Sequence, residues 1–595
     1  MTTHLSARLA WHDNGWNGHI CSNPKGNTYC VGQHSFPGDM CAKRRDLVSE
    51  EANAGKPIKG LAQIPPCVYS ANAFGVDTVR GFAPPPEWFR DGTGVAEWDM
   101  PPATVIVWPY EEMYHDDVLN PPKTTPKYDA EKRRKRAEDF FAEITSDRSL
   151  IFYYANYSNP LSEGDEKYYV IVGVSRVKKV GSEIHWLNQS DEMERRYGRY
   201  VWERNITAHY PDQGLRLPYH RYMDRPEVLE RILLTPENER NFKYGTRRMS
   251  DGDALILIEQ LSEAVKVLEE IGDTSENWAQ RQAWLASVMA ELWRSRGLYP
   301  GLATVLDYLQ FAEAIPHLKK QVMAQCDVQA LKDAIFAWLD GKAQEISGLA
   351  LPKKRTDEVR RQWHLLEDAQ RTILRDILPR FALETGQVKA IVAFSSEVSI
   401  RTSLAEVIEN PYLLAEQYVG MGPDDRITFS KIDHGMIPSP DLGASVDATT
   451  DDWRRLRALC VEQLKAVSEH TFLPASQVIE GANNRLSILP EWKRHTFTER
   501  YLRVDEEVLS HALTFREENG QLYLYRREIY EDEREVAATL RKLAALPNIQ
   551  PRSPVTAGHW RNWLYDDKSV LAQRHPSAYE RTVTEQVTVR QPSFR

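Results

Sequence analysis

Cysteines and histidines gather at the start of the chain, where their side chains could bind a metal. The segment holds Cys21, Cys30, Cys41 and Cys67, with His12, His19 and His34 among them. Thiolates and imidazoles that converge from a Gly-, Asn- and Pro-rich backbone can hold Zn²⁺ or an iron–sulfur cluster. The gaps are long and include no Cys-x-x-Cys pair, so the alternative is a loop-rich domain with buried, unligated thiols. If a metal is bound, we expect Cys21, Cys30, Cys41 and Cys67 to be its ligands.

Other catalytic patterns are missing from the sequence. A phosphate-binding loop needs Gly-x-x-x-x-Gly-Lys-Ser/Thr, because its amides and lysine surround the phosphates, and the chain has no such run. It has no Gly-x-Ser-x-Gly elbow for a serine nucleophile either. Glu491 and Lys493, far from Asp441, offer only a common pattern for a Mg²⁺-dependent nuclease. We therefore predict no catalytic residue, and we do not expect the chain to be an enzyme by itself.

Composition indicates a folded chain with several domains. The 595 residues are 42% hydrophobic and 27% charged, which is ordinary for globular proteins. No run approaches the roughly 18 apolar residues of a membrane span, and the N-terminus lacks a secretory signal pattern, so we expect a cytoplasmic protein without a membrane partner. The net charge of −10 means that any contact with DNA must come from local basic patches.

Periodicity along the chain predicts an α+β multidomain protein, with a loop-rich, β-containing N-terminal half and a mostly α-helical C-terminal half. Runs at 104–108, 149–154 and 168–174 are β-branched and aromatic, as strands are. Apolar residues recur at helical steps from Leu255 to Leu268, before Gly272. The expected regions are a Cys/His/Pro-rich domain (1–130), an aromatic-rich β or α+β domain (131–225), a helical domain (226–380), a hairpin and pre-motor region (381–547) and a loosely structured tail (548–595).

The run from Glu409 to Gly422 carries a likeness to a known family. Asn410 can cap a helix, Pro411 suits its first turn, and Gly420-Met421-Gly422 can form a tight hairpin. In a helix-hairpin-helix, such glycines let backbone amides approach a phosphate. The run resembles the helix-hairpin-helix segment that precedes the motor in RecD-type superfamily 1 DNA helicases. Here Pro423, Asp424 and Asp425 follow the glycines and place negative charge beside the turn.

Segments after the hairpin extend the resemblance. The run 453–457, followed by 470–474, is similar to the helix and winged-helix-like start of that family, and 520–543 is similar to the strand and helix that lead into the motor. The resemblance implies a helix-hairpin-helix and a winged-helix-like segment in the C-terminal half. It also implies DNA contacts from Gly420, Gly422, Arg454, Arg455 and Arg457.

Two functional hypotheses follow. The resemblance without a phosphate-binding loop implies a non-catalytic DNA-binding or helicase-accessory protein for DNA repair or defence. Such a protein would bind single-stranded or forked DNA and act with a separately encoded helicase motor, or it would be the front part of a longer helicase. The alternative is a metal-dependent enzyme or sensor that uses the N-terminal Cys/His cluster with Zn²⁺ or an iron–sulfur cluster.

Overall fold

The computed structural model forms two compact units, Met1–Arg527 and Glu528–Arg595. It describes residues 2–30, 46–83, 96–109, 130–162, 167–187, 200–243, 245–323, 327–393, 400–422, 425–443, 448–467 and 470–546. None of the helices in these ranges is both long and apolar enough to cross a membrane.

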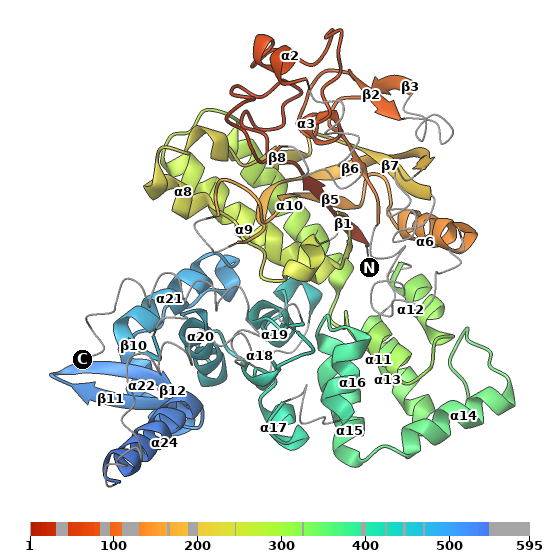
Figure 1. Cartoon of the computed structure of the whole chain (residues 1–595). Helices are drawn as coiled ribbons and strands as arrows, with labels where there is room; N and C mark the ends of the chain where they lie inside the picture. Colours follow the sequence, from red (N-terminus) through yellow and green to blue (C-terminus); the bar gives the residue numbers. More distant parts are fainter. Residues whose placement is uncertain are drawn as a thin grey trace, which may run out of the picture. The chain divides into compact units, whose positions relative to one another are not determined.

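A seven-stranded sheet forms the centre of the N-terminal half (Figure 1). Its order is β4-β7-β6-β5-β1-β9, with β8 also paired to β6. The strands are β1 (His4–Leu9), β4 (Thr104–Val107), β5 (Leu150–Ala155), β6 (Val170–Leu187), β7 (Tyr200–Ala208), β8 (Gly214–Arg216) and β9 (Arg248–Met249). Strands β1 and β5 are parallel and every other pairing in this sheet is antiparallel. The N-terminal strand therefore lies inside the sheet, next to a strand about 145 residues later in the sequence.

Helices cover this sheet and complete one hydrophobic core. They are α3 (Val68–Ala71), α6 (Ala130–Ala142), α8 (Pro226–Ile232), α9 (Asp251–Glu270) and α10 (Trp278–Arg296). Helix α9 begins where Ser250 accepts a hydrogen bond from the Asp253 amide, and it stops before Gly272, whose φ is +71°. The core runs from Leu5 to Trp293, so it includes residues from both sides of the boundaries expected at 130 and 225. A separate hairpin, β2 (Val79–Ala83) with β3 (Ala96–Met100), and the short helix α2 (Leu47–Ala52) lie in the same half.

A second core contains mostly helices and runs from Leu302 to Leu524. Its first helices are α11 (Leu302–Tyr308), α12 (Ala314–Met323), α13 (Val328–Leu339), α14 (Lys353–His364), α15 (Asp368–Thr372), α16 (Thr385–Ala393), α17 (Leu404–Glu409), α18 (Leu413–Gln417) and α19 (Phe429–Met436). The boundary expected at 380 lies inside this core.

The last part of the second core has the order of elements of a winged helix. That order is α20 (Trp453–Ala466), β10 (Phe472–Pro474), α21 (Ala475–Ser487), α22 (Glu499–Val504), α23 (Glu506–Leu509), β11 (Leu513–Glu518) and β12 (Gln521–Arg526). The sheet order is β10-β12-β11, so β12, the second strand of the β11–β12 hairpin, lies between β11 and β10. The short helix η6 (Glu491–Lys493) lies between α21 and α22.

The expected fold class is confirmed: the chain is multidomain and mixes helices with sheets that lie mainly in the N-terminal half. Most of helix α24 (Arg527–Ala544) lies in the second unit, and the tail from 547 onward lies outside the described residues.

Candidate metal centre and hairpin segment

The polypeptide that leaves β1 delivers His12 to the interior. Leu9 ends the strand, and the His12 side chain three residues later is 1% exposed. Both of its ring nitrogens are buried and, within the described part of the chain, make no regular hydrogen bond. The groups that act on the ring are the thiols of Cys21 and Cys67, which are weak hydrogen-bonding partners.

Three buried thiols form a ring with this imidazole. The Cys30 thiol is in hydrogen-bonding contact with both Cys21 and Cys67, and the His12 ring interacts with Cys21 and Cys67. Cys21 and Cys30 come from the turns after β1, and Cys67 comes from the residue that precedes α3. The structure thus brings together three of the four predicted cysteines, and His12 completes the ring.

Protonation in the ring is already suited to binding a cation. The hydrogen bond from Cys30 lowers the pKa of both Cys21 and Cys67, while the same contacts raise the pKa of Cys30. Burial acts to lower the pKa of His12, but the neighbouring Cys21 and Cys67 groups raise it well above its ordinary value. Thiolates are the form that ligates metals, so bound metal would displace the remaining protons from Cys30 and His12.

Neighbouring polar groups hold the ring in place. Asn27 donates from Nδ2 to the Cys21 Sγ at 3.2 Å and to the Trp11 carbonyl at 3.0 Å. Asp13 has a carboxylate oxygen within 4.8 Å of the His12 and Cys21 donor atoms. However, its two oxygens accept the Ser22 and Asn23 amides, both at 2.7 Å, so Asp13 orders the turn that carries Cys21. Outer groups of this kind orient metal ligands.

By type, the donor set suits Zn²⁺ better than a cluster. Three thiolates and one imidazole are a common set for structural zinc, whereas iron–sulfur clusters usually use four cysteines. Among the described residues, the donor atoms of His12, Asp13 and Cys21 all lie within 4.8 Å of one another, and the Cys30 and Cys67 thiols, which are outside that set, would have to move closer to complete a tetrahedral site. Cys41 was predicted as the fourth ligand and lies outside the described residues. His12 was named in the sequence among the imidazoles of this segment, but the expected ligand set contained the four cysteines alone.

In the hairpin segment, a carboxylate of the chain itself occupies the backbone amide next to the glycines. Gly420 is buried with φ +71°, and a Cβ there would lie 2.0 Å from the Asp425 carbonyl oxygen, so only glycine fits. The Asp425 carboxylate accepts hydrogen bonds from the Met421 amide at 3.0 Å and the Tyr418 hydroxyl at 3.1 Å. An amide that would face a phosphate thus binds this carboxylate. Gly422 is half-buried in the same turn.

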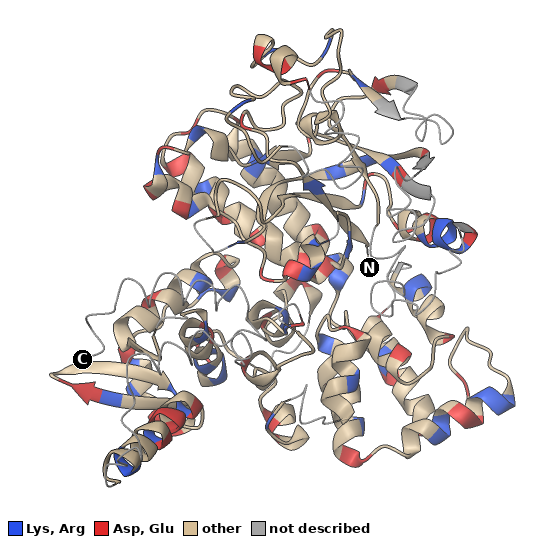
Figure 2. Cartoon of the chain, in the orientation of Figure 1, with Lys and Arg blue, Asp and Glu red and all other residues tan. Residues whose placement is uncertain are grey.

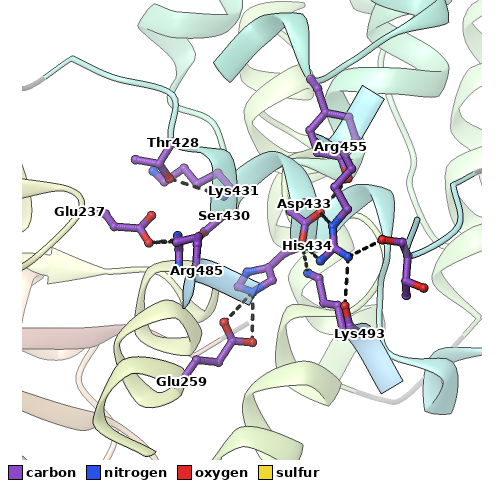
Figure 3. A network of polar contacts seen from close by, with 12 residues as sticks. Glu237, Glu259, Thr428, Ser430, Lys431, Asp433, His434, Arg455, Arg485 and Lys493 are labelled. Carbon is purple, nitrogen blue, oxygen red and sulfur yellow. Dashed lines mark hydrogen bonds and ion pairs between the residues drawn. The ribbon is translucent and has the colours of Figure 1, made fainter. Parts of the chain in front are cut away.

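Two of the three arginines expected to contact DNA are buried in ion pairs, and Figure 3 shows one of them, Arg455, beside Asp433. Arg455 is 0% exposed and donates from Nε and Nη2 to Asp433 at 2.8 and 2.9 Å. Arg457 pairs with the buried Glu416 at 3.1 Å. Arg454 remains partly exposed but pairs with Asp452 at 2.7 Å. The guanidinium groups of Arg455 and Arg457 are therefore committed to the interior, which corrects their expected role as phosphate ligands.

Asp433 on α19 is the centre of this buried network. Lys493 approaches its carboxylate at 3.0 Å, and the Tyr412 hydroxyl donates to it at 2.7 Å, besides Arg455. Although burial acts to raise it, the pKa of Asp433 is held far below its ordinary value by Arg455 and Lys493. The next residue, His434, pairs with Glu259 on α9 at 3.0 Å, and both side chains are 2% exposed. The network thus joins the second core to the first (Figure 3).

Comparison with known proteins gives little functional information. No family model matches the chain, and no solved structure matches it. A similar curated protein is an uncharacterized protein of Methanocaldococcus jannaschii, 24% identical over 493 residues. The match covers 78% of this chain and 37% of that protein, so the chain spans little more than a third of its length.

We predict that the purified protein contains about one zinc ion per chain. His12→Ala and Cys67→Ser should each remove most of it, because a structural site needs all four donors. Metal content by mass spectrometry and the melting temperature with and without chelator measure the effect.

Two matched thiol variants control that experiment. Cys460→Ser removes an isolated thiol buried in α20 and should leave the zinc content unchanged. Cys41→Ser should also keep the zinc. If Cys41→Ser lost the metal while His12→Ala retained it, the ligand set described here would be wrong.

We predict that Arg455→Met lowers the free energy of unfolding by about 3–5 kcal/mol, because it removes one partner from a buried ion pair. Arg503→Ala is the control, since Arg503 pairs with Glu517 at the surface, with 51% and 59% of the two side chains exposed. Its cost should be below about 1 kcal/mol. Equal stability of the two variants in urea titrations would contradict the structural role of Arg455.

Proposed function

We propose that this chain is a non-catalytic accessory protein of a DNA helicase, which docks a separately encoded motor through the end of its second core. The observation that carries the proposal is the element order α20-β10-α21-α22-α23-β11-β12, with the sheet order β10-β12-β11, directly after the hairpin segment. Winged-helix elements after a helix-hairpin-helix are what the resemblance to RecD-type helicases implies ahead of a motor.

The charge on the β11–β12 hairpin (513–526), which we call the wing, favours docking to protein over binding to DNA. Figure 2 shows acidic residues at the end of β11, and the tip of the hairpin carries Glu517 and Glu518 before the turn at Asn519 and Gly520. Carboxylates repel a phosphate backbone, whereas they suit a basic protein surface. The burial of Arg455 and Arg457 removes two more cations from this region. The hairpin, with its anion position filled by Asp425, supports the same preference.

The match covers 37% of the similar archaeal protein, so most of that protein has no counterpart in the matched region. A motor encoded separately would supply the missing ATP chemistry.

The test begins with a search for a neighbouring open reading frame that contains a phosphate-binding loop, and continues with binding and unwinding assays on the motor that it encodes. The two proteins should form a complex, and the chain should increase unwinding of forked DNA. Glu517→Lys with Glu518→Lys should weaken the complex roughly tenfold, because it reverses the charge of the docking tip.

The matched control reverses two exposed carboxylates elsewhere. Glu230→Lys with Glu269→Lys changes the net charge equally on α8 and α9 and should leave the complex intact. Absence of a complex, or equal loss with both double variants, would count against the proposal.

The metal centre supports a second candidate function, a metal-dependent sensor. The ring of His12, Cys21, Cys30 and Cys67 supplies four donors, which leaves no open position for substrate on a tetrahedral ion. This favours a structural or sensing role over metal-dependent catalysis.

A further inference from the structure

A cationic side chain, Arg8, lies near the carboxyl end of the parallel strand pair, where the described residues supply no carboxylate to pair with it. Arg8 on β1 is in register with Tyr154 on β5, so the two side chains stand side by side on one face of the sheet. The carboxyl ends of parallel strands are where ligands bind in many α/β sheets. Both residues lie near that end of their strands.

The guanidinium of Arg8 is desolvated among phenol rings. Its Nε is buried, and no hydrogen-bond partner for this atom is found within the described ranges. Burial lowers the pKa of Arg8, and the groups that favour its charge are the hydroxyls of Tyr154, Tyr169 and Tyr157. No carboxylate of the described residues forms an ion pair with it. An unpaired, partly buried cation is costly, so the site is electrostatically suited to an anion.

Three tyrosines next to Arg8 form a row of rings that reaches the surface. The ring centroids of Tyr154 and Tyr169 are 5.8 Å apart, and those of Tyr169 and Tyr157 are 6.0 Å apart, in edge-to-face contact. Tyr154 is fully buried, whereas Tyr157 is 49% exposed. The row thus places an accessible aromatic ring near a buried positive charge.

The loop that carries Tyr157 is held by an internal hydrogen-bond network. Asn159, which is 1% exposed, donates to the Asn156 carbonyl at 2.8 Å and to the Tyr168 carbonyl at 3.0 Å. Its side-chain oxygen accepts the Leu161 amide at 2.9 Å. A loop fixed in this way presents the Tyr157 ring with little entropy left to lose on binding.

We propose that Arg8 and Tyr157 bind one nucleotide unit of a single-stranded nucleic acid, with the phosphate paired to Arg8 and the base stacked on Tyr157. Guanidinium groups pair with phosphate oxygens, and any base can stack on a tyrosine face, so this chemistry needs no particular sequence. Arg247 adds positive charge near Tyr154. The inference rests on the DNA-related function proposed above and assigns the strand to the N-terminal sheet instead of the hairpin.

Fluorescence anisotropy with labelled dT12 tests this site in the full chain. Tyr157→Ala should raise the dissociation constant roughly tenfold, because one base loses its stacking partner. Arg8→Gln should weaken binding and lower the slope of log affinity against log salt by about 0.7, the value for one phosphate contact on a single strand. Arg225→Gln removes an exposed arginine outside the site and should change neither quantity beyond the effect of net charge.

Several outcomes separate the alternatives. Unchanged affinity in both site variants, or losses no larger than that of Arg225→Gln, would overturn the assignment. Equal affinity for dTMP and dT12 would assign the site to free nucleotides and also overturn it. Melting temperatures show whether Arg8→Gln is folded, and the surface variant Tyr157→Ala tests the site independently. Docking of the motor through the wing does not involve these residues, so that complex should persist in both variants.

Discussion

The pairing of β1 with β5 is the constraint on which the N-terminal half depends. Six residues near the start of the chain enter the sheet between β5 and β9, and Leu5, Ala7 and Leu9 are fully buried there. His4 fixes the strand further by its 3.2 Å contact with Asp251 at the start of α9. Because β1 is paired with a strand on each side, the segment that follows it leaves the sheet at a defined point. The candidate metal centre begins at that point with His12.

The second core depends in a similar way on one buried carboxylate. The Asp433 carboxylate forms ion pairs with Arg455 and Lys493 and accepts a hydrogen bond from Tyr412. These three residues come from three different segments of the chain. Such a network stabilises one arrangement, since loss of Asp433 would leave the buried cations Arg455 and Lys493 without their shared anion. Together with the pair between His434 and Glu259, it couples helix α19 to the first core. The arginines that resemble DNA ligands in the sequence therefore serve to join helices.

Local patterns predicted the elements well. The sequence runs at 104–108 and 149–154 became β4 and β5, and the helical steps from Leu255 to Leu268 lie in α9, which ends before Gly272. Within these segments, the spacing of apolar residues and the residues at the ends are enough to indicate the type of element. The domain boundaries could not be read in the same way, because the pairing of β1 with β5 joins regions that differ strongly in composition.

The sites required information that the sequence does not hold. Cys21, Cys30 and Cys67 were recognisable by type as candidate metal ligands, but nothing in their spacing indicated that His12 lies against Cys21 and Cys67. Arg455 and Arg457 belong to a stretch of α20, from Arg455 to Val461, in which every residue is buried. Their partners Asp433 and Glu416 lie 22 and 41 residues away, a distance at which sequence pattern gives no signal.

Extended X-ray absorption at the zinc edge of the purified protein tests the central claim most directly. We predict three sulfur ligands at about 2.3 Å and one nitrogen ligand at about 2.0–2.1 Å. A shell of four sulfurs, or one of nitrogen and oxygen alone, would contradict the ring of His12, Cys21, Cys30 and Cys67.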